Sequence, residues 1–201
     1  MISLSFFKKA RKELGDNIIF VGESVHKEFS EYLKTINVNS TPDDLMYPTF
    51  DTLYNYNYFV ALSNYILGKE KLSKVVDELN RDKNNLRLLC LENHDNERIA
   101  SILSNDRLHA FLRLFAFIKG QLFIYAGQEY GNKHKPELFE KDPVDFSYKD
   151  EDIYQMYLEA ISEKKSQKEI MDMLFILTGD NSLKVKVTYI DKTTKEKEFV
   201  L

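Results

Sequence analysis

The alternation of apolar and polar positions divides the chain into helical and extended segments. Over 2–14 the apolar residues recur at helical spacing, basic residues occupy the remaining face, and Gly15 closes the helix. Helical spacing predicts further helices over 27–36, 108–118 and 152–165, and two helical pieces around Gly68 within 58–80. These segments alternate with short apolar runs.

The apolar runs predict buried strands at 17–21, 86–91 and 121–125, and the aromatic-rich segment 47–58 adds a strand at 50–53. Strands that alternate with helices indicate an α/β architecture with a parallel sheet. After residue 166 the pattern changes to strands at 173–179, 182–190 and 195–201, joined by turns. We therefore expect an α/β domain over 1–165 and an antiparallel β appendage over 166–201.

Composition narrows the class of protein. The chain has 201 residues, of which 43% are hydrophobic and 30% charged, as in a folded protein. Its net charge of −4, with lysines and acids interspersed, argues against nucleic acid and anionic membranes as partners. The single cysteine, Cys90, lies in an apolar run, so we expect a buried thiol in a reducing compartment. We find no signal peptide or membrane span and expect a cytoplasmic protein.

Polar residues with chemical potential follow three of the predicted strands. They are Glu23 in Gly22–Glu23–Ser24, the run Glu92–Asn93–His94–Asp95, and Glu129 in Gly127–Gln128–Glu129. The carboxyl ends of parallel strands open on one face, so these carboxylates are expected to share a pocket. A pair of carboxylates in one pocket is the arrangement that a two-carboxylate reaction needs.

Each feature also has a structural interpretation. Glu23 could be the first-turn acid of the next helix, His94 and Asp95 could satisfy loop backbone groups, and Glu129 could be an interior acid paired with a buried base. Metal sites fit poorly. Glu23-x-x-His26 occurs once, whereas a di-iron bundle needs two copies, and no paired cysteines accompany Cys90. The sequence also has no Gly-rich phosphate loop and no Gly-x-Ser-x-Gly elbow.

Taken in order, these motifs resemble the alpha-amylase family of glycoside hydrolases, whose catalytic domain is a (β/α)8 TIM barrel. Phe20–Val21–Gly22–Glu23 is similar to the end of the family's fifth strand, and 50–56 to the segment around the sixth. Asn93–His94–Asp95, with Arg98 shortly after, is similar to the seventh, and the segment 123–131 to the eighth. The resemblance implies a partial TIM barrel comprising strands 5 to 8 with their helices, followed by the start of the family's β domain.

The resemblance also implies residue roles on an alpha-linked glucan or oligosaccharide. Glu23 would be the general acid/base, Asp95 the second acid that stabilises the transition state, and His94 and His26 sugar-binding residues. A proton donor that works near neutral pH needs a raised pKa, which a neighbouring carboxylate in a confined pocket provides. No cofactor is expected, because the family's calcium-binding insertion would lie in the other half of the barrel.

One part of the family's site has no counterpart here. The family's nucleophile is an aspartate in Arg-x-Asp-x-Ala after the fourth strand, and no Arg-x-Asp precedes Glu23. We therefore expect this chain to be inactive alone. Two alternatives remain open: a second chain, either the amino-terminal half-barrel or another copy, completes the barrel, or the chain is a non-catalytic glycan-binding or interaction protein whose binding survives Glu23→Gln.

Overall fold

The computed structural model describes residues 2–25 and 27–201, and its centre is a set of four very short parallel strands. Strand β1 (Val21–Gly22) pairs with β2 (Thr52–Leu53), and β3 (Leu88–Leu89) pairs with β4 (Gln121–Leu122). A parallel bridge between Leu53 and Arg87 connects the two pairs. The strands therefore follow one another in chain order across the sheet, as the alternation of strands and helices predicts.

Helices separate these strands, and most of them lie where helical spacing places them. The helices are α1 (Leu4–Leu14), α2 (Lys27–Thr35), α3 (Asp43–Met46), α4 (Tyr56–Ile66), α5 (Leu72–Arg81), α6 (Ile99–Ile102), α7 (Asn105–Phe117) and α8 (Glu151–Ser166). Gly15 and Gly68 end α1 and α4 with positive φ angles of 74° and 70°. The two four-residue helices, α3 and α6, are too short for a periodic signal and were not predicted.

The prediction of a buried strand over 17–21 is wrong in extent and in burial. Only Val21 and Gly22 pair with β2, and the side chains of Ile18, Ile19 and Val21 are 47%, 72% and 55% exposed. β1 pairs only with β2, so among the described residues no strand covers its other edge, where backbone groups stay unpaired. The other predicted parallel strands, at 50–53, 86–91 and 121–125, are also shorter than expected, although Leu88 to Leu91 are buried and Cys90 has no exposed surface.

The carboxyl-terminal segment forms the predicted antiparallel sheet. β5 (Ile170–Gly179), β6 (Ser182–Tyr189) and β7 (Thr194–Val200) pair in the order β5-β6-β7. Turns at 180–181 and 190–193 join them, and Lys192 takes a positive φ of 66° in the second turn. Met173, Phe175, Val185 and Val187 line the buried face of the sheet.

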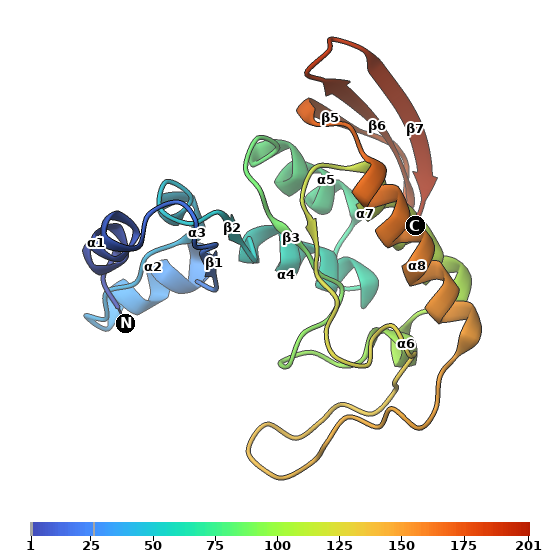
Figure 1. The fold of residues 1–201 in the computed structure, drawn as a ribbon, viewed down its shortest axis with the longest axis horizontal. Helices are drawn as coiled ribbons and strands as arrows, with labels where there is room; N and C mark the ends of the chain where they lie inside the picture. The colour runs from blue at the N-terminus through green and yellow to red at the C-terminus, as the bar shows by residue number, and fades with distance from the viewer. Residues whose placement is uncertain (1, 26) are drawn as a thin grey trace.

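The main hydrophobic core runs through both parts of the chain. It contains residues of α4, α5, α7 and α8 together with β5, β6 and β7, so the sheet packs on the helices without a separate core. Figure 1 shows α1, α2 and α3 with β1 at one end of the molecule and the β5–β7 sheet with α7 and α8 at the other. The domain boundary at 165/166 stays a prediction. Among the described helices, none has the length and apolar character to cross a membrane.

Candidate functional site

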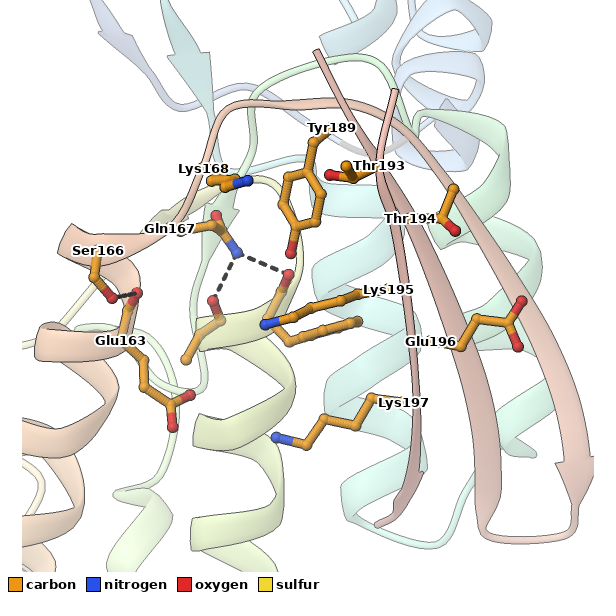
Figure 2. Close-up of a pocket in the computed structure, with 12 residues that line it drawn as sticks. Glu163, Ser166, Gln167, Lys168, Tyr189, Thr193, Thr194, Lys195, Glu196 and Lys197 are labelled. Atoms are coloured by element: carbon orange, nitrogen blue, oxygen red, sulfur yellow. Dashed lines mark hydrogen bonds between the residues drawn. The ribbon is translucent and has the colours of Figure 1, made fainter. Parts of the chain in front are cut away.

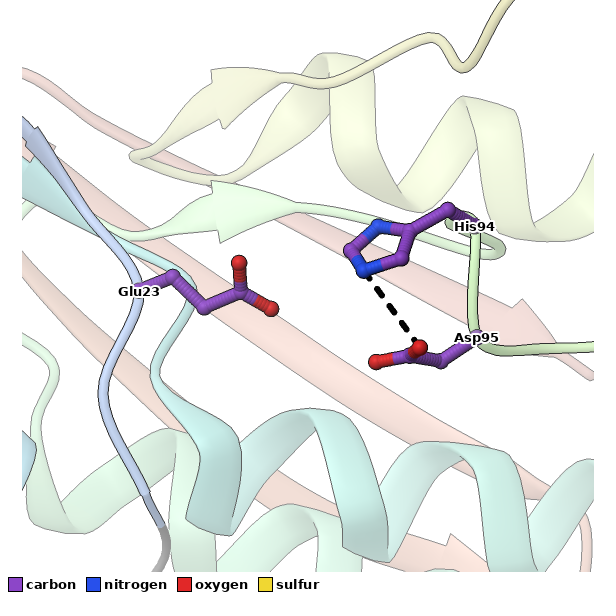
Figure 3. Close-up of side chains that lie close together, drawn as sticks. All are labelled: Glu23, His94 and Asp95. Atoms are coloured by element: carbon purple, nitrogen blue, oxygen red, sulfur yellow. Dashed lines mark ion pairs between the residues drawn. The ribbon is translucent and has the colours of Figure 1, made fainter. Parts of the chain in front are cut away.

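Three of the residues that the sequence singles out lie together beside the strand ends. Glu23 follows β1, and His94 and Asp95 lie in the loop after β3. One carboxylate oxygen or imidazole nitrogen from each residue lies within 4.8 Å of the corresponding atoms of the other two residues. His94 Nε2 is 3.3 Å from Asp95 Oδ1. Figure 3 shows the Glu23 carboxylate facing the His94–Asp95 pair. Two carboxylates and an imidazole from strand ends some 70 residues apart therefore form one cluster.

Gly22 explains locally how Glu23 reaches this position. A Cβ atom on Gly22 would lie 2.8 Å from Phe50 Cδ1 and would also collide with the side chain of Leu53. Only glycine lets β1 approach β2 this closely, so the chain leaves the sheet with Glu23 as its first residue after β1.

The His94–Asp95 loop is fixed by two hydrogen bonds. The backbone N–H of Asp95 donates to Asn93 Oδ1 at 3.0 Å, which closes a tight Asx turn after β3. Lys135 Nζ donates to the Asp95 carbonyl at 2.7 Å. Lys135 comes from the long segment between β4 and α8, and it was missed because nothing in its sequence context indicates that this segment returns to the site.

A buried ion pair lies immediately beyond this loop. Glu92 and Arg98 have no exposed side-chain surface, and Arg98 Nε lies 3.1 Å from Glu92 Oε1. Burial raises the pKa of the Glu92 carboxyl, while the Ile99 N–H and the Arg98 guanidinium oppose that rise. Arg98 also donates to the carbonyls of Ala126 at 2.9 Å and Asn132 at 3.3 Å. Arg98 therefore ties the loop after β3 to the loop after β4.

Gly127 makes this tie possible. Its φ is 82°, and a Cβ there would lie 3.1 Å from Arg98 Nη2 and 2.7 Å from Asn132 Nδ2. The glycine of the QLFIYAGQE segment thus leaves room for a guanidinium.

Glu129 does not join the described cluster, and nothing places the predicted residue His26, which is not among the described residues. Glu129 is half-buried, its Oε2 has no hydrogen-bond partner among the described residues, and its charge contributes to the raised pKa of Glu92. The side-chain atoms that converge at the cluster come from Glu23, His94 and Asp95, and Glu129 is not among them. The expectation that the carboxylates after all three strands share one pocket is therefore wrong for Glu129. His26 lies outside the described residues, so its predicted sugar contact stays a prediction.

Tyr56 was not predicted as a site residue, although it lies in the aromatic segment that stands out in the sequence. Its hydroxyl donates a hydrogen bond to Glu23 Oε1. Tyr56 is the first residue of α4 and follows β2 closely, so three successive strand ends contribute to the site. The signal that could have found Tyr56 is its position, because it places a polar hydroxyl soon after the end of a predicted strand.

The site is open rather than confined. Glu23 is exposed, and the Asp95 side chain is 54% exposed, so the expected confined pocket is not formed by the described residues. An apolar groove of about 270 Å³ runs from Glu23 and Ser24 along the open edge of β1, lined by Val21, Phe7 and Phe50 among others. Glu23 therefore borders both the His94–Asp95 pair and this apolar groove.

A second pocket, of about 790 Å³, lies away from these residues, between the ends of α7 and α8 and strand β7 (Figure 2). Gln167 donates to the carbonyls of Ala116 and Phe117 there, both at 2.8 Å, and so caps α7. Lys195 and Lys197 project from β7 toward Glu163. The lining lacks paired carboxylates of the kind found around Glu23, so we place the candidate chemistry at the Glu23 cluster.

Comparison with known proteins identifies the fold and then the family. An alpha-amylase from Lactobacillus plantarum superposes with a TM-score of 0.79 at 23% identity, over 92% of this chain and 47% of that chain. A maltogenic alpha-amylase from Thermotoga neapolitana gives 0.69 at 22% identity, over 93% and 46%. An alpha-amylase from Geobacillus thermoleovorans, solved with acarbose, gives 0.64 at 16% identity, over 94% and 44%. This chain thus spans about half the length of these structures.

The family model for the alpha-amylase catalytic domain matches residues 3–188. The chain therefore belongs to the alpha-amylase family of glycoside hydrolases. A search of curated protein sequences gave no match.

Proposed function

We propose that this chain supplies one side of the catalytic site of an alpha-amylase-type retaining glycosidase that cleaves alpha-glucosidic bonds. The observation that carries the proposal is the convergence of Glu23, His94 and Asp95 within 4.8 Å, from two strand ends far apart in the sequence. Glu23 acts as the general acid/base, which protonates the glycosidic oxygen and then activates water. Asp95 stabilises the positive charge that develops on the sugar ring, and His94 hydrogen-bonds the bound sugar.

In this proposal the described strands are the fifth to eighth strands of a (β/α)8 barrel, and the final sheet begins the β domain that follows it. The parallel order β1-β2-β3-β4 supports this assignment. Matches that cover nearly all of this chain but about half of each relative support it as well. The nucleophile belongs to a strand that precedes β1 in the barrel, so the chain alone has no turnover.

The polypeptide that completes the barrel adds a parallel strand to β1. The exposed side chains of Ile19 and Val21 and the adjoining apolar groove support an edge that another strand covers. Glu23 lies in the lining of this groove, so the added strand ends beside the acid. This is where a retaining mechanism needs the nucleophile, about 5 Å from the acid/base.

The test is a chimera in which this chain replaces the matched half of the Lactobacillus plantarum alpha-amylase, assayed with a chromogenic alpha-linked maltooligosaccharide. Circular dichroism establishes that the chimera is folded. We expect no turnover by the chain alone, turnover by the chimera, and a loss of at least about 10³-fold in kcat in its Glu23→Gln and Asp95→Asn forms.

Other outcomes would contradict specific parts of the proposal. A folded chimera without turnover, or with turnover that Glu23→Gln leaves unchanged, contradicts the catalytic role. Turnover by the chain alone that both substitutions abolish would mean that another carboxylate of this chain, or a second copy of the chain, supplies the nucleophile. Maltooligosaccharide binding that survives Glu23→Gln, without turnover in the chimera, would identify a glycan-binding protein.

A further inference from the structure

The contact between Tyr56 and Glu23 joins an exposed acid to a tightly held phenol. Glu23 has a long, flexible side chain, is exposed, and follows the edge strand β1. Tyr56 is the first residue of α4. The first turn of this helix is packed into the interior, where Tyr58 and Phe59 are 1% and 3% exposed. The phenol of the half-buried Tyr56 therefore offers the carboxylate a fixed hydrogen-bond donor.

The backbone of Tyr56 is clamped by a buried carboxylate. Its N–H donates to Asp43 Oδ2 at 2.6 Å, and Asp43 is buried, with only 2% of its surface exposed. Burying a carboxylate costs free energy unless it is hydrogen-bonded. The Asp43 oxygen satisfies an N–H in the first turn of α4, where the helix itself provides no acceptor.

The preceding residue, Asn55, fixes the same turn from the other side. It has no exposed surface and a left-handed backbone with φ of 53°. Its side chain donates to Tyr47 Oη at 3.0 Å and to Asp82 Oδ2 at 3.1 Å, and accepts from the Tyr58 N–H at 3.2 Å. A strained residue held by three hydrogen bonds gives the chain one direction at this point, and that direction aims Tyr56 at Glu23.

The ring of Tyr56 is also held by its neighbours. It stacks on Tyr54, with the centroids 5.8 Å apart, and meets Phe59 edge-on at 6.1 Å. Tyr54 in turn packs against Phe123, which follows β4. Aromatic contacts of this kind restrict the ring to one orientation, so its hydroxyl has little freedom to follow a moving carboxylate.

We infer that Tyr56 is the positioning residue for Glu23: its phenol holds Oε1 so that the carboxylate faces His94 and Asp95. The inference rests on the proposed function, in which Glu23 is the acid/base. Holding one oxygen leaves Oε2 for proton transfer to the glycosidic oxygen. The benefit is geometric, because displacement of a reacting group by about 1 Å can cost about 10²-fold in rate. Tyr56 itself contacts neither the reacting atoms nor, in this account, the sugar.

The first test measures the rotamer of Glu23 in the full chain, with no catalysis required. Three-bond couplings of selectively labelled glutamate report whether the side chain populates one rotamer or several. We expect one dominant rotamer for Glu23 in the natural sequence and averaging in Tyr56→Phe. Tyr54→Phe, which removes the neighbouring hydroxyl, is the matched control and leaves the rotamer unchanged. Averaging already present in the natural sequence, or an unchanged rotamer in Tyr56→Phe, overturns the inference.

The second test separates positioning from a purely structural contribution. Phenylalanine keeps the ring packing, so the urea midpoint of Tyr56→Phe should match that of the natural chain. In the catalytically competent chimera, Tyr56→Phe should lower kcat about 10- to 100-fold with KM within threefold. An unchanged kcat overturns the inference. If Glu23→Gln itself has no effect in the chimera, the proposed function fails, whereas the rotamer result still decides the contact.

Discussion

Arg98 and Glu92 form an ion pair with no exposed side-chain surface, directly behind the loop that carries His94 and Asp95. The same guanidinium bonds the Ala126 and Asn132 carbonyls, so one side chain connects the segments that follow β3 and β4. The geometry of the candidate site therefore depends on a charge pair that never reaches solvent.

Arg98→Met should be strongly destabilising, by about 3–5 kcal/mol in the free energy of unfolding, because it leaves the Glu92 carboxylate buried without its partner. Urea denaturation measures the loss. The double variant Glu92→Leu with Arg98→Met should recover part of it, since no unpaired charge remains. Lys186→Met is the control: its pair with Glu196 is exposed, so the expected change is below about 1 kcal/mol. Equal losses for Arg98→Met and Lys186→Met would contradict the buried pair.

Asp43 predicts a specific pH dependence of stability. Burial raises its pKa from 3.8 to about 6 in the folded protein. The folded state therefore binds the proton more tightly than the unfolded state, and this contribution to stability is complete below pH 3.8 and is lost as the pH rises through about 6. A shift of about two units corresponds to about 3 kcal/mol.

Asp43→Asn should remove this contribution, so the stability of the variant should fall less between pH 4 and pH 6 than that of the natural chain. Asp180→Asn, at an exposed position in the turn at 180–181, provides the control and should leave the profile as it is. Urea midpoints measured across this range give the slope. A slope that Asp43→Asn does not flatten would show that Asp43 titrates normally.

The open edge of β1 makes a contrasting prediction. Ile19 and Val21 are 72% and 55% exposed, so replacing either by lysine should change the free energy of unfolding by less than about 0.5 kcal/mol. Leu53, the β2 partner of Gly22, has no exposed surface, and Leu53→Ala should cost about 2–5 kcal/mol. Losses above 2 kcal/mol for Ile19→Lys would mean that an element of this chain covers the edge in solution.

Sequence reasoning located most helices because their apolar faces pack against one core. It also placed Glu23, His94 and Asp95 together, because parallel strands end on a common face. It failed at 17–21, where an apolar run indicates burial but the described structure leaves the edge uncovered. It could not find Tyr56, whose contact depends on the left-handed turn at Asn55 and the buried acceptor on Asp43, or the buried pairing of Arg98 with Glu92.

The central claim is that Glu23, His94 and Asp95 form one glucan-binding site, and imidazole NMR tests it most directly. The full chain, with ¹⁵N-labelled histidine, is titrated with acarbose, the ligand named for the Geobacillus structure. Single substitutions assign the signals, and His109 on α7 reports on another part of the surface. The account predicts saturable shifts at His94 that Asp95→Asn weakens, with His109 unmoved. Saturable shifts confined to His109, or a His94 signal unchanged at millimolar acarbose, would contradict it.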